Sequence, residues 1–547
     1  GNSTIGGTST GAITLGAATL STGTTLTVGT GIGNAITLGT VNGSAGTPNL
    51  TINTTSTASV GAVGATIGTV TVTQSGGTTF NSTVNAATVT LTATTGNITF
   101  SGALTATTLN TAGTYNIAIN AGGTITNVVT FSNSGTLTLA GTTTFTGGVT
   151  ATAPSQVNIG GTVQSTDSAI SIGDSGTPTV LTATTTISAG TGDITLGGTV
   201  DGASALTLNS TGATTLSGAV GGGTGTALTS LTTNASGTTV INGGSVKTSG
   251  TQTYGDPVTL GAGTTLTTTA PSAITFASTV NSSSTSNLTF ATGTGTATFT
   301  GAVGGTNALG TITNASGQQL IFSDAVTATT IANYGTLLFQ ASSAKTISPN
   351  ITDNGTTTIQ VINSADGAPG IITFSGNVAA DTITIGTTTK AGSALFNGTV
   401  LKGAGTTNVN IVGGDVSGEN SLANFANTVT VTAITLDDNT GTASVIFSGT
   451  GTTITGTING AAAGEGTITV SGTPTFASII GGSQRPGQLT INGATTFQDA
   501  VTTTALTTTA AISNGTTLSV TGTSSIGASI TTTGTQTYTG NATLTNA

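Results

Sequence analysis

Few residues of this 547-residue chain have side chains that could catalyse a reaction or bind a metal, and the carboxylates are the main candidates. Asp437 and Asp438 are adjacent acids in the sequence Leu-Asp-Asp-Asn-Thr-Gly, and Asp415 with Glu419 is a second, weaker candidate pair. Such pairs could bind Ca²⁺ or act as acid pairs. The ligand spacing of EF-hand and Gly-Gly-x-Gly-x-Asp loops is missing at both places. We interpret both pairs as solvated turns, and whether Asp437 and Asp438 bind calcium stays open.

The remaining acids and the cations do not form a catalytic pattern. Asp256, Asp324 and Asp499 occupy a position of a repeated module that elsewhere holds glycine, so we expect them to form turns. β-Helix enzymes that act on polysaccharides need Asp clustered with Lys or Arg on one face. The cations of this chain are instead scattered, at Lys345, Lys390, Lys402 and Arg485 among others.

Two further features could suggest ligand binding. The segment 221–225, Gly-Gly-Gly-Thr-Gly, resembles a phosphate loop only superficially, because no helix-forming sequence follows it. The four tyrosines could stack on sugars. Tyr254 and Tyr538 occupy the aromatic position of the repeated module, so we expect them in the core, while Tyr115 and Tyr334 stay candidates.

The overall inventory excludes several classes of function. The chain has no His and no Cys, with 5 basic and 15 acidic residues. Catalysis needs titratable groups held close together, so we predict a non-enzymatic protein with no catalytic residue, cofactor or metal. Five cations cannot form a basic groove, which argues against nucleic-acid binding. No run of 18 apolar residues exists, so we expect no membrane insertion by this segment.

The elements that must position these residues are predicted to be β-strands. Only 4% of the residues are charged, against about 25% in a typical globular domain, and no Lys, Arg, Asp or Glu precedes Asp167. Disordered chains combine low hydrophobicity with high net charge, whereas this chain is 35% hydrophobic. The abundant Thr, Val and Ile favour strands because branching at Cβ suits a pleated surface.

A short module recurs along the chain with the form Phe-x-x-x-Val, usually with Gly, Asp, Ser or Asn at its third position. Ten of the 15 phenylalanines occupy its first position. We predict that they form a structural core ladder, made of Phe80, Phe100, Phe145, Phe276, Phe299, Phe322, Phe374, Phe396, Phe425 and Phe497. The spacing of successive modules is often about 20 to 23 residues, which is the size of one coil of a parallel β-helix.

Longer echoes and strand signals support the same architecture. The segment 206–222 matches 288–305, which gives a period of about 80 to 83 residues, or about four coils. Segments such as Ile194-Thr-Leu196 alternate apolar and polar residues, so one side of each strand is buried. The pairs Asn42-Gly43, Asn242-Gly243 and Asn397-Gly398 are expected to supply corners with positive φ.

The fold class predicted from these patterns is all-β, a parallel β-helix or β-solenoid with coils of about 20 to 23 residues. At roughly 4.8 Å per coil, the chain would make about 25 coils over about 120 Å. We predict one continuous solenoid over 1–547, with a Phe-free start at 1–70 and regular repeats at 71–348 and 371–547. The stretch 349–370, which contains Asp366 and Gly367, is expected to be an irregular loop. The chain begins and stops in repeat-like sequence without a signal peptide or cap, so we expect an excerpt that continues or stacks end to end.

The repeats resemble those of a known class of surface proteins. Thr251-Gln-Thr-Tyr-Gly-Asp-Pro-Val-Thr-Leu-Gly-Ala262, Gly190-Thr-Gly-Asp-Ile-Thr-Leu196 and Gly218-Ala-Val-Gly-Gly222 are similar to repeats of filamentous-haemagglutinin-like exoproteins and autotransporter passengers. The resemblance covers residues 190–330 well and the rest by style only. It implies a right-handed parallel β-helix that is exported to the bacterial cell surface or secreted and used in adhesion.

The sequence supports four hypotheses about function to different degrees. The first is the structural shaft of a surface adhesin that binds a host-surface receptor or glycan. The second is a subunit of an extracellular filament or surface layer that self-associates end to end or side by side. The third is ice binding by Thr-x-Thr arrays, against which coils of unequal length argue, because they would not present one flat face. The fourth is a polysaccharide-active enzyme, which the missing acid and base clusters disfavour.

Overall fold

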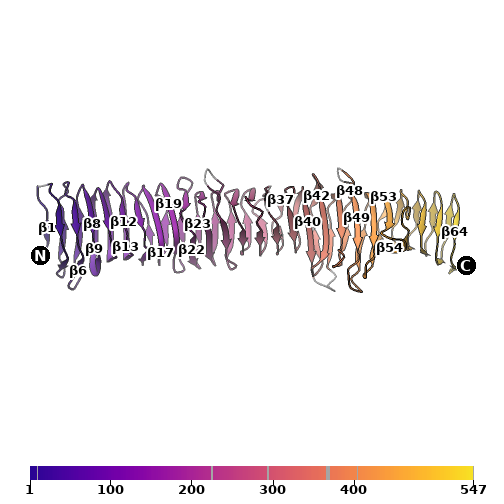
Figure 1. The fold of residues 1–547 in the computed structure, drawn as a ribbon, viewed down its shortest axis with the longest axis horizontal. Helices are drawn as coiled ribbons and strands as arrows, with labels where there is room; N and C mark the ends of the chain where they lie inside the picture. The colour runs from indigo at the N-terminus through magenta and orange to yellow at the C-terminus, as the bar shows by residue number, and fades with distance from the viewer. Residues whose placement is uncertain are drawn as a thin grey trace. The chain divides into compact units, whose positions relative to one another are not determined.

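The computed structural model describes residues 1–547 apart from 9, 223–225, 292, 294, 365–369, 403–404 and 546–547. The described residues form 65 strands and no helix, and the strands pair in parallel, coil upon coil (Figure 1). The predicted β-solenoid is therefore confirmed. The chain divides into two compact units, Gly1–Ser272 and Ala273–Ala547, here called unit 1 and unit 2. Among the described residues no helix has the length and apolar character needed to cross a membrane.

Unit 1 is a stack of coils in which each full turn contributes to three ladders, named a, b and c. Ladder a contains β1 (Ser3–Ile5), β4 (Thr25–Val28), β7 (Asn49–Asn53), the second halves of β9 (Val63–Ser75), β11 (Val84–Thr94) and β13 (Leu104–Thr111), β16 (Val129–Thr130), β18 (Val149–Ala151), β20 (Ile170–Ile172), β23 (Ile194–Leu196), β26 (Ala213–Leu216), β28 (Thr238–Ile241) and β31 (Val258–Leu260). Ladder b contains β2 (Ile13–Leu15), β5 (Ile36–Leu38), β8 (Thr57–Val60), β10 (Gly77–Phe80), β12 (Ile98–Phe100), β14 (Ile117–Ile119), the first halves of β17 (Thr136–Phe145) and β19 (Gln156–Gln164), β21 (Thr179–Leu181), β24 (Val200–Asp201), β29 (Ser245–Thr248) and β32 (Thr264–Thr268). Ladder c contains β3 (Ala18–Leu20), β6 (Val41–Gly43), the other halves of β9, β11, β13, β17 and β19, β15 (Gly123–Ile125), β22 (Thr185–Gly190), β25 (Ala205–Ser210), β27 (Ser230–Thr233) and β30 (Gln252–Tyr254).

Unit 2 is built in the same way from three ladders, named d, e and f. Ladder d contains β33 (Ile274–Phe276), β36 (Ala297–Phe299), β38 (Gln319–Phe322), β40 (Thr336–Ala341), β43 (Thr358–Asn363), β46 (Thr382–Ile385), β49 (Asn408–Val412), the second halves of β51 (Val429–Asp437) and β53 (Thr450–Gly460), β58 (Val501–Thr503), β61 (Leu518–Val520) and β64 (Gln536–Tyr538). Ladder e contains β34 (Val280–Ser282), β41 (Lys345–Ile347), β44 (Ile371–Phe374), β47 (Ser393–Phe396), β50 (Ser421–Phe425), β52 (Ala443–Phe447), β54 (Glu465–Val470), β56 (Pro486–Ile491), β59 (Ala505–Thr508), β62 (Ser524–Ile526) and β65 (Ala542–Leu544). Ladder f contains β35 (Leu288–Phe290), β37 (Leu309–Asn314), β39 (Ala328–Asn333), β42 (Asn350–Asp353), β45 (Val378–Ala380), β48 (Val400–Lys402), the first halves of β51 and β53, β55 (Thr473–Phe476), β57 (Thr495–Phe497), β60 (Ile512–Asn514) and β63 (Ile530–Thr532).

The coils vary in length more than the spacing of the modules predicts. Leu320 pairs with Leu337 in a short coil, whereas Ser393 pairs with Leu422 in a much longer one. The strands keep their parallel register in both cases, so the difference lies in the corners. Within the stretch 349–370, which was expected to be irregular, β42 and β43 are regular strands, and Asp366 and Gly367 lie outside the described residues. Right-handed coiling stays a prediction.

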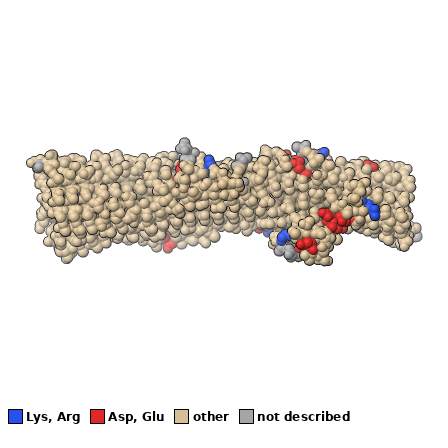
Figure 2. All heavy atoms as spheres, in the orientation of Figure 1, with Lys and Arg blue, Asp and Glu red and all other residues tan. Residues whose placement is uncertain are grey.

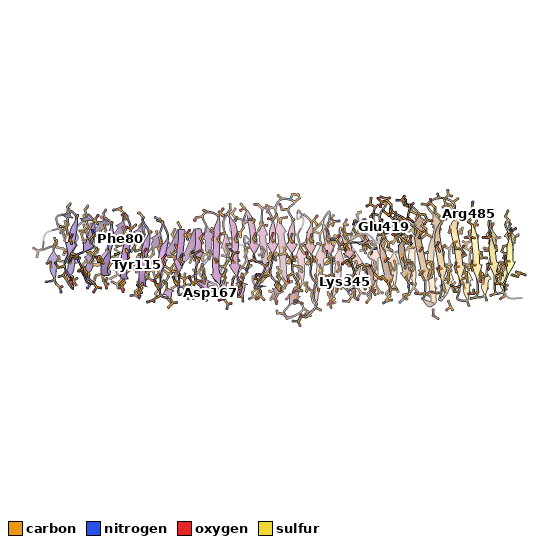
Figure 3. All side chains as sticks on the ribbon, turned by 90° about the horizontal axis from the view of Figure 1, so that it is seen from below. Phe80, Tyr115, Asp167, Lys345, Glu419 and Arg485 are labelled. Carbon is orange, nitrogen blue, oxygen red and sulfur yellow. The ribbon has the colours of Figure 1, made fainter. Side chains whose placement is uncertain are left out.

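The core of each unit is a narrow stack of inward side chains. Alternate residues of each strand point inward, so identical or similar apolar residues meet from coil to coil, as Ile13 pairs with Ile36 and Leu15 with Leu38. All ten phenylalanines of the predicted ladder are at most 1% exposed, and Figure 3 places Phe80 within unit 1. Burial of this kind supplies most of the free energy that holds the coils together.

The phenylalanines form a continuous series of ring contacts in unit 2, but they do not stay in one ladder. Phe276, Phe299 and Phe322 stack in ladder d with ring centroids 4.9 Å apart. The series runs on through Phe339, Phe374, Phe396, Phe425, Phe447 and Phe476 to Phe497. Its two edge-to-face contacts, at 88° and 89°, occur where it passes from ladder d to ladder e and from ladder e to ladder f. A perpendicular ring bridges two sides of the core, where a stacked ring could not.

The glycines of the three Asn-Gly pairs have a different role from the one expected. Gly43, Gly243 and Gly398 are absent from the residues with positive φ, so the expected positive-φ corners are wrong at these positions. A Cβ added to Gly243 would lie 2.0 Å from the carbonyl oxygen of Gly218 in the neighbouring coil, and one on Gly398 2.1 Å from that of Gly376. Glycine is needed because stacked corners bring two backbones together.

Candidate binding site at a loop-bearing corner

The corner between ladders d and e of unit 2 is where successive coils carry loops. After β46, β49, β51, β53 and Ile480, the chain makes loops 386–392, 413–420, 438–442, 461–464 and 481–485 before it joins ladder e. We call these five loops the loop corner. Because the coils stack in register, loops far apart in the sequence come together on one edge of the unit.

Hydrogen bonds join the loops of the loop corner in two groups, the first three loops and the last two. The N–H of Gly441 donates to the carbonyl oxygen of Gly414 at 2.8 Å, and the N–H of Gly464 donates to that of Arg485 at 2.9 Å. The Asn439 side-chain amide donates to the carbonyl oxygen of Thr388 at 3.0 Å, which ties the third loop to the first. Each loop is therefore held by at least one of the others.

Charged residues gather at the loop corner. Of the 5 basic and 15 acidic residues in the chain, two and five lie in these loops or next to them, namely Lys390, Asp415, Glu419, Asp437, Asp438, Glu465 and Arg485. Figure 2 shows acidic and basic side chains gathered over one part of unit 2, and Figure 3 places Glu419 and Arg485 along one edge of it. The loop corner is thus chemically unlike the Thr-rich and Ser-rich faces around it.

Loop 413–420 also exposes an aliphatic side chain. Val416 is 56% exposed, next to the exposed Asp415 and shortly before Gly418, whose φ is +96°. An exposed aliphatic group beside a carboxylate at a loop tip can make apolar and charged contacts with a partner together. Loops positioned by a rigid scaffold are where binding residues most often lie.

Asp438 joins two coils. Its Oδ1 accepts the N–H of Ala443 at 2.6 Å, and its Oδ2 accepts the N–H of Gly466 in the next coil at 2.8 Å. Both carboxylate oxygens are thus taken by backbone donors, which is the geometry of a turn residue. Among the residues that the structure describes, no group of three or more His, Cys, Asp or Glu side chains could hold a metal ion.

Glu419 differs from the solvated turn residue that the sequence suggested. It is 7% exposed, and its Oε2 has no hydrogen-bond partner in the part of the chain that the structure describes. The carboxylate is folded under the loop against Gly414, where an added Cβ would lie 2.4 Å from Oε2. Two consecutive glycines, Gly413 and Gly414, leave the space that this side chain fills, whereas Asp415 stays exposed.

The three module acids act in turns, with additions that the sequence did not indicate. Asp324 and Asp499 each accept the N–H of the following residue at 2.7 Å. Asp256 is buried and accepts the N–H of Gly237 at 2.7 Å and the hydroxyl of Thr239 at 3.2 Å. Asp324 also forms an ion pair with Lys345, with Oδ1 and Nζ 2.7 Å apart. The two residues are one coil apart along the chain, which is the signal that could have revealed the pair.

Asp324 gives a pH-dependent contribution to stability. Burial alone would raise its pKa, but the hydrogen bond from Lys345, that from the Ala325 N–H and the charge of Lys345 together hold the pKa below its usual value. A carboxyl with a lowered folded-state pKa stabilises the fold above its unfolded pKa, and this is lost as the pH falls through the folded pKa. We expect Asp324→Asn to cost at most about 1 kcal/mol at neutral pH and less near pH 2, measured by urea unfolding.

The control for that prediction is Asp499→Asn, which changes the same position of another module. It should show no comparable difference between the two pH values. An equal cost of Asp324→Asn at both pH values would show that the ion pair does not stabilise the fold.

The four tyrosines and the glycine-rich segment 221–225 are the remaining candidates, and the tyrosines differ in burial. Tyr115 donates its hydroxyl hydrogen to the carbonyl oxygen of Leu91 at 2.8 Å and Tyr254 donates to Gln252 at 3.0 Å, and burial raises the pKa of both phenols. Tyr538 is partly exposed and Tyr334 is 39% exposed. Of the segment 221–225, residues 223–225 lie outside the described residues.

A second surface is a shallow groove of about 540 Å³ on the outward side of ladder b in unit 1. Hydroxyl and amide groups line it, from Thr37, Ser59, Thr79, Asn81 and Asn97. The side-chain amide of Asn81 donates to the Ser59 hydroxyl at 2.7 Å, so part of this polar lining is already paired within the protein.

Comparisons with protein-family models, with curated proteins and with solved structures find no match to this chain.

Proposed function

We propose that this chain is the structural shaft of a secreted or cell-surface bacterial adhesin, which binds its partner through the loop corner and without catalysis. The observation that carries the proposal is the contrast within unit 2. Most of its surface is a regular stack of Thr-rich and Ser-rich strands, and one corner gathers five hydrogen-bonded loops with seven charged residues and an exposed valine. A host-surface receptor or glycan is the partner class that this arrangement supports.

The architecture suits such a role for physical reasons. Each coil contacts only its neighbours, so a solenoid can lengthen without a new core and can carry loops at any coil. The loops change little of the stack, because the strands before them, β46, β49 and β51, and the strands after them, β47, β50 and β52, stay paired in parallel register. The resemblance of residues 190–330 to surface-exported repeats is consistent with exposure at the bacterial cell surface.

Substitutions at the loop tip test the proposal. We expect Asp415→Asn combined with Val416→Ser to weaken binding of the purified chain to cultured host cells, or to a glycan on an array, by about tenfold or more, equivalent to about 1.4 kcal/mol. Both side chains are exposed, so melting should be unchanged. The control is Leu401→Ser, since Leu401 is 42% exposed on β48 in ladder f, away from the loop corner.

Two outcomes would contradict the proposal. Equal loss of binding by the Leu401→Ser control would move the contact away from the loop corner. If the unchanged chain binds no cell or glycan and instead forms ordered filaments or lattices under the electron microscope, it is a self-assembling subunit of a filament or surface layer.

A further inference from the structure

The outward side of ladder a in unit 1, from β1 to β13, carries threonines in register. One column runs through Thr4, Thr27, Thr51, Thr71 and Thr90, each the pairing partner of the next. A second column two residues earlier contains Thr25, Asn49, Thr69, Thr88 and Thr108. We call these two columns the threonine face.

The threonine face is regular although its coils are not equal in length. The coil that leads from Thr27 to its partner Thr51 is longer than the coil that leads from Thr71 to its partner Thr90, yet both pairs are in register. The corners absorb the difference, and the objection that unequal coils cannot present one regular face does not hold here. Rows of hydroxyls therefore repeat at about 4.8 Å along the stack and about 6.7 Å along each strand.

The side chains of the threonine face are held in place. The residues between the two columns, Leu26, Leu50, Val70 and Val89, are at most 5% exposed and fix each strand on the core. Most of the threonines themselves are only partly exposed, because each packs against its neighbours. A β-branched side chain has few rotamers, so the hydroxyl array is ordered before any ligand arrives.

Charge defines the class of ligand. No Lys, Arg, Asp or Glu occurs in residues 1–166, and Figure 2 shows hardly any charged atoms over unit 1. A complementary partner is therefore uncharged, forms hydrogen bonds and repeats on the same scale of a few ångströms. We propose that the threonine face binds ice, a periodic and uncharged lattice of hydrogen-bonded water to which a rigid hydroxyl array can be matched.

The proposal is tested on the purified chain by thermal hysteresis and by inhibition of ice recrystallisation. The unchanged chain is expected to slow ice growth, and Thr71→Tyr combined with Thr90→Tyr is expected to abolish most of that activity, because two bulky rings interrupt the first column and cover part of the second. The control is Thr275→Tyr combined with Thr298→Tyr, which places the same pair of rings on neighbouring coils of ladder d in unit 2, outside the threonine face. It should keep the activity.

Melting of all three proteins by circular dichroism separates loss of ice binding from loss of fold. Absence of any effect of the unchanged chain on ice overturns the proposal, and so does equal loss by both double variants when both melt as the unchanged chain does. Binding to microcrystalline cellulose without thermal hysteresis would assign the face to a neutral polysaccharide and would also overturn it. None of these results depends on the loop corner, which lies in unit 2.

Discussion

Phe299→Asp is expected to open the coils around residue 299 of unit 2. Phe299 is fully buried, with its ring centroid 4.9 Å from those of Phe276 and Phe322 and 5.9 Å from that of Phe290, which it meets in an edge-to-face contact. Loss of a buried phenylalanine ring costs about 3 to 5 kcal/mol. A carboxylate without a partner in the same place adds several kcal/mol more, because its desolvation is not compensated. This is the largest single-residue effect that we predict.

The effect should be local, because a solenoid is stabilised between nearest neighbours. Hydrogen exchange is expected to show lost protection in β33, β36 and β38, with less change in β54 and β56. The matched control is Thr298→Asp, which places the same carboxylate one residue earlier on the outward side of β36. If Phe299→Asp melts like the unchanged chain, the inward position of the phenylalanine series is wrong.

Gly243→Val is expected to separate two coils of unit 1. Its φ is not positive, so valine meets no backbone strain of that kind, but the new Cβ would lie 2.0 Å from the carbonyl oxygen of Gly218 and 2.1 Å from its carbonyl carbon. Backbone must shift to relieve this contact, and overpacking of this kind costs about 1 to 3 kcal/mol or more. Gly218, whose carbonyl group is involved, lies at the corresponding corner of the preceding coil.

The comparison that isolates the collision is Gly263→Val. Gly263 also has no positive φ and has nothing within 4 Å of an added Cβ, so valine there should change the urea midpoint little. Similar midpoints for the two valine variants would mean that close approach of the corners is not the reason for glycine at residue 243.

Much of the fold could be predicted from the sequence because the spacing of repeated residues gives the length of one coil. Phe276, Phe299 and Phe322 are evenly spaced along the chain and do lie one above the other in ladder d. Alternation in segments such as Ile194-Thr-Leu196 likewise gave the inward and outward sides of the strands. Both signals depend on local pattern and on one-dimensional stacking, so a single sequence is enough to reveal them.

Other features could not be predicted because they depend on how corners fit together in three dimensions. Spacing alone does not say which ladder a module joins, so the passage of the aromatic series from Phe339 to Phe374 was not visible. The burial of Glu419 depends on the space beside Gly414, and the loop corner depends on five loops that are far apart in the sequence and stack on one edge. A sequence separation of one coil, such as that from Asp324 to Lys345, is the one signal in the sequence that indicates a contact between neighbouring coils.

The phenylalanine series, the loop corner and the threonine face all rest on the register of the coils, and a disulfide tests that register most directly. The chain has no cysteine, so a pair can be introduced without competing thiols. Thr71 and Thr90 are pairing partners in neighbouring coils, about 4.8 Å apart between Cα atoms, which a disulfide can span. Thr71 and Asn110 are two coils apart, at about 9.6 Å, which it cannot. We expect Thr71→Cys with Thr90→Cys to form an intramolecular disulfide under mild oxidation, and Thr71→Cys with Asn110→Cys not to form one. Cross-linking of the second pair, or failure of the first, would contradict the stack.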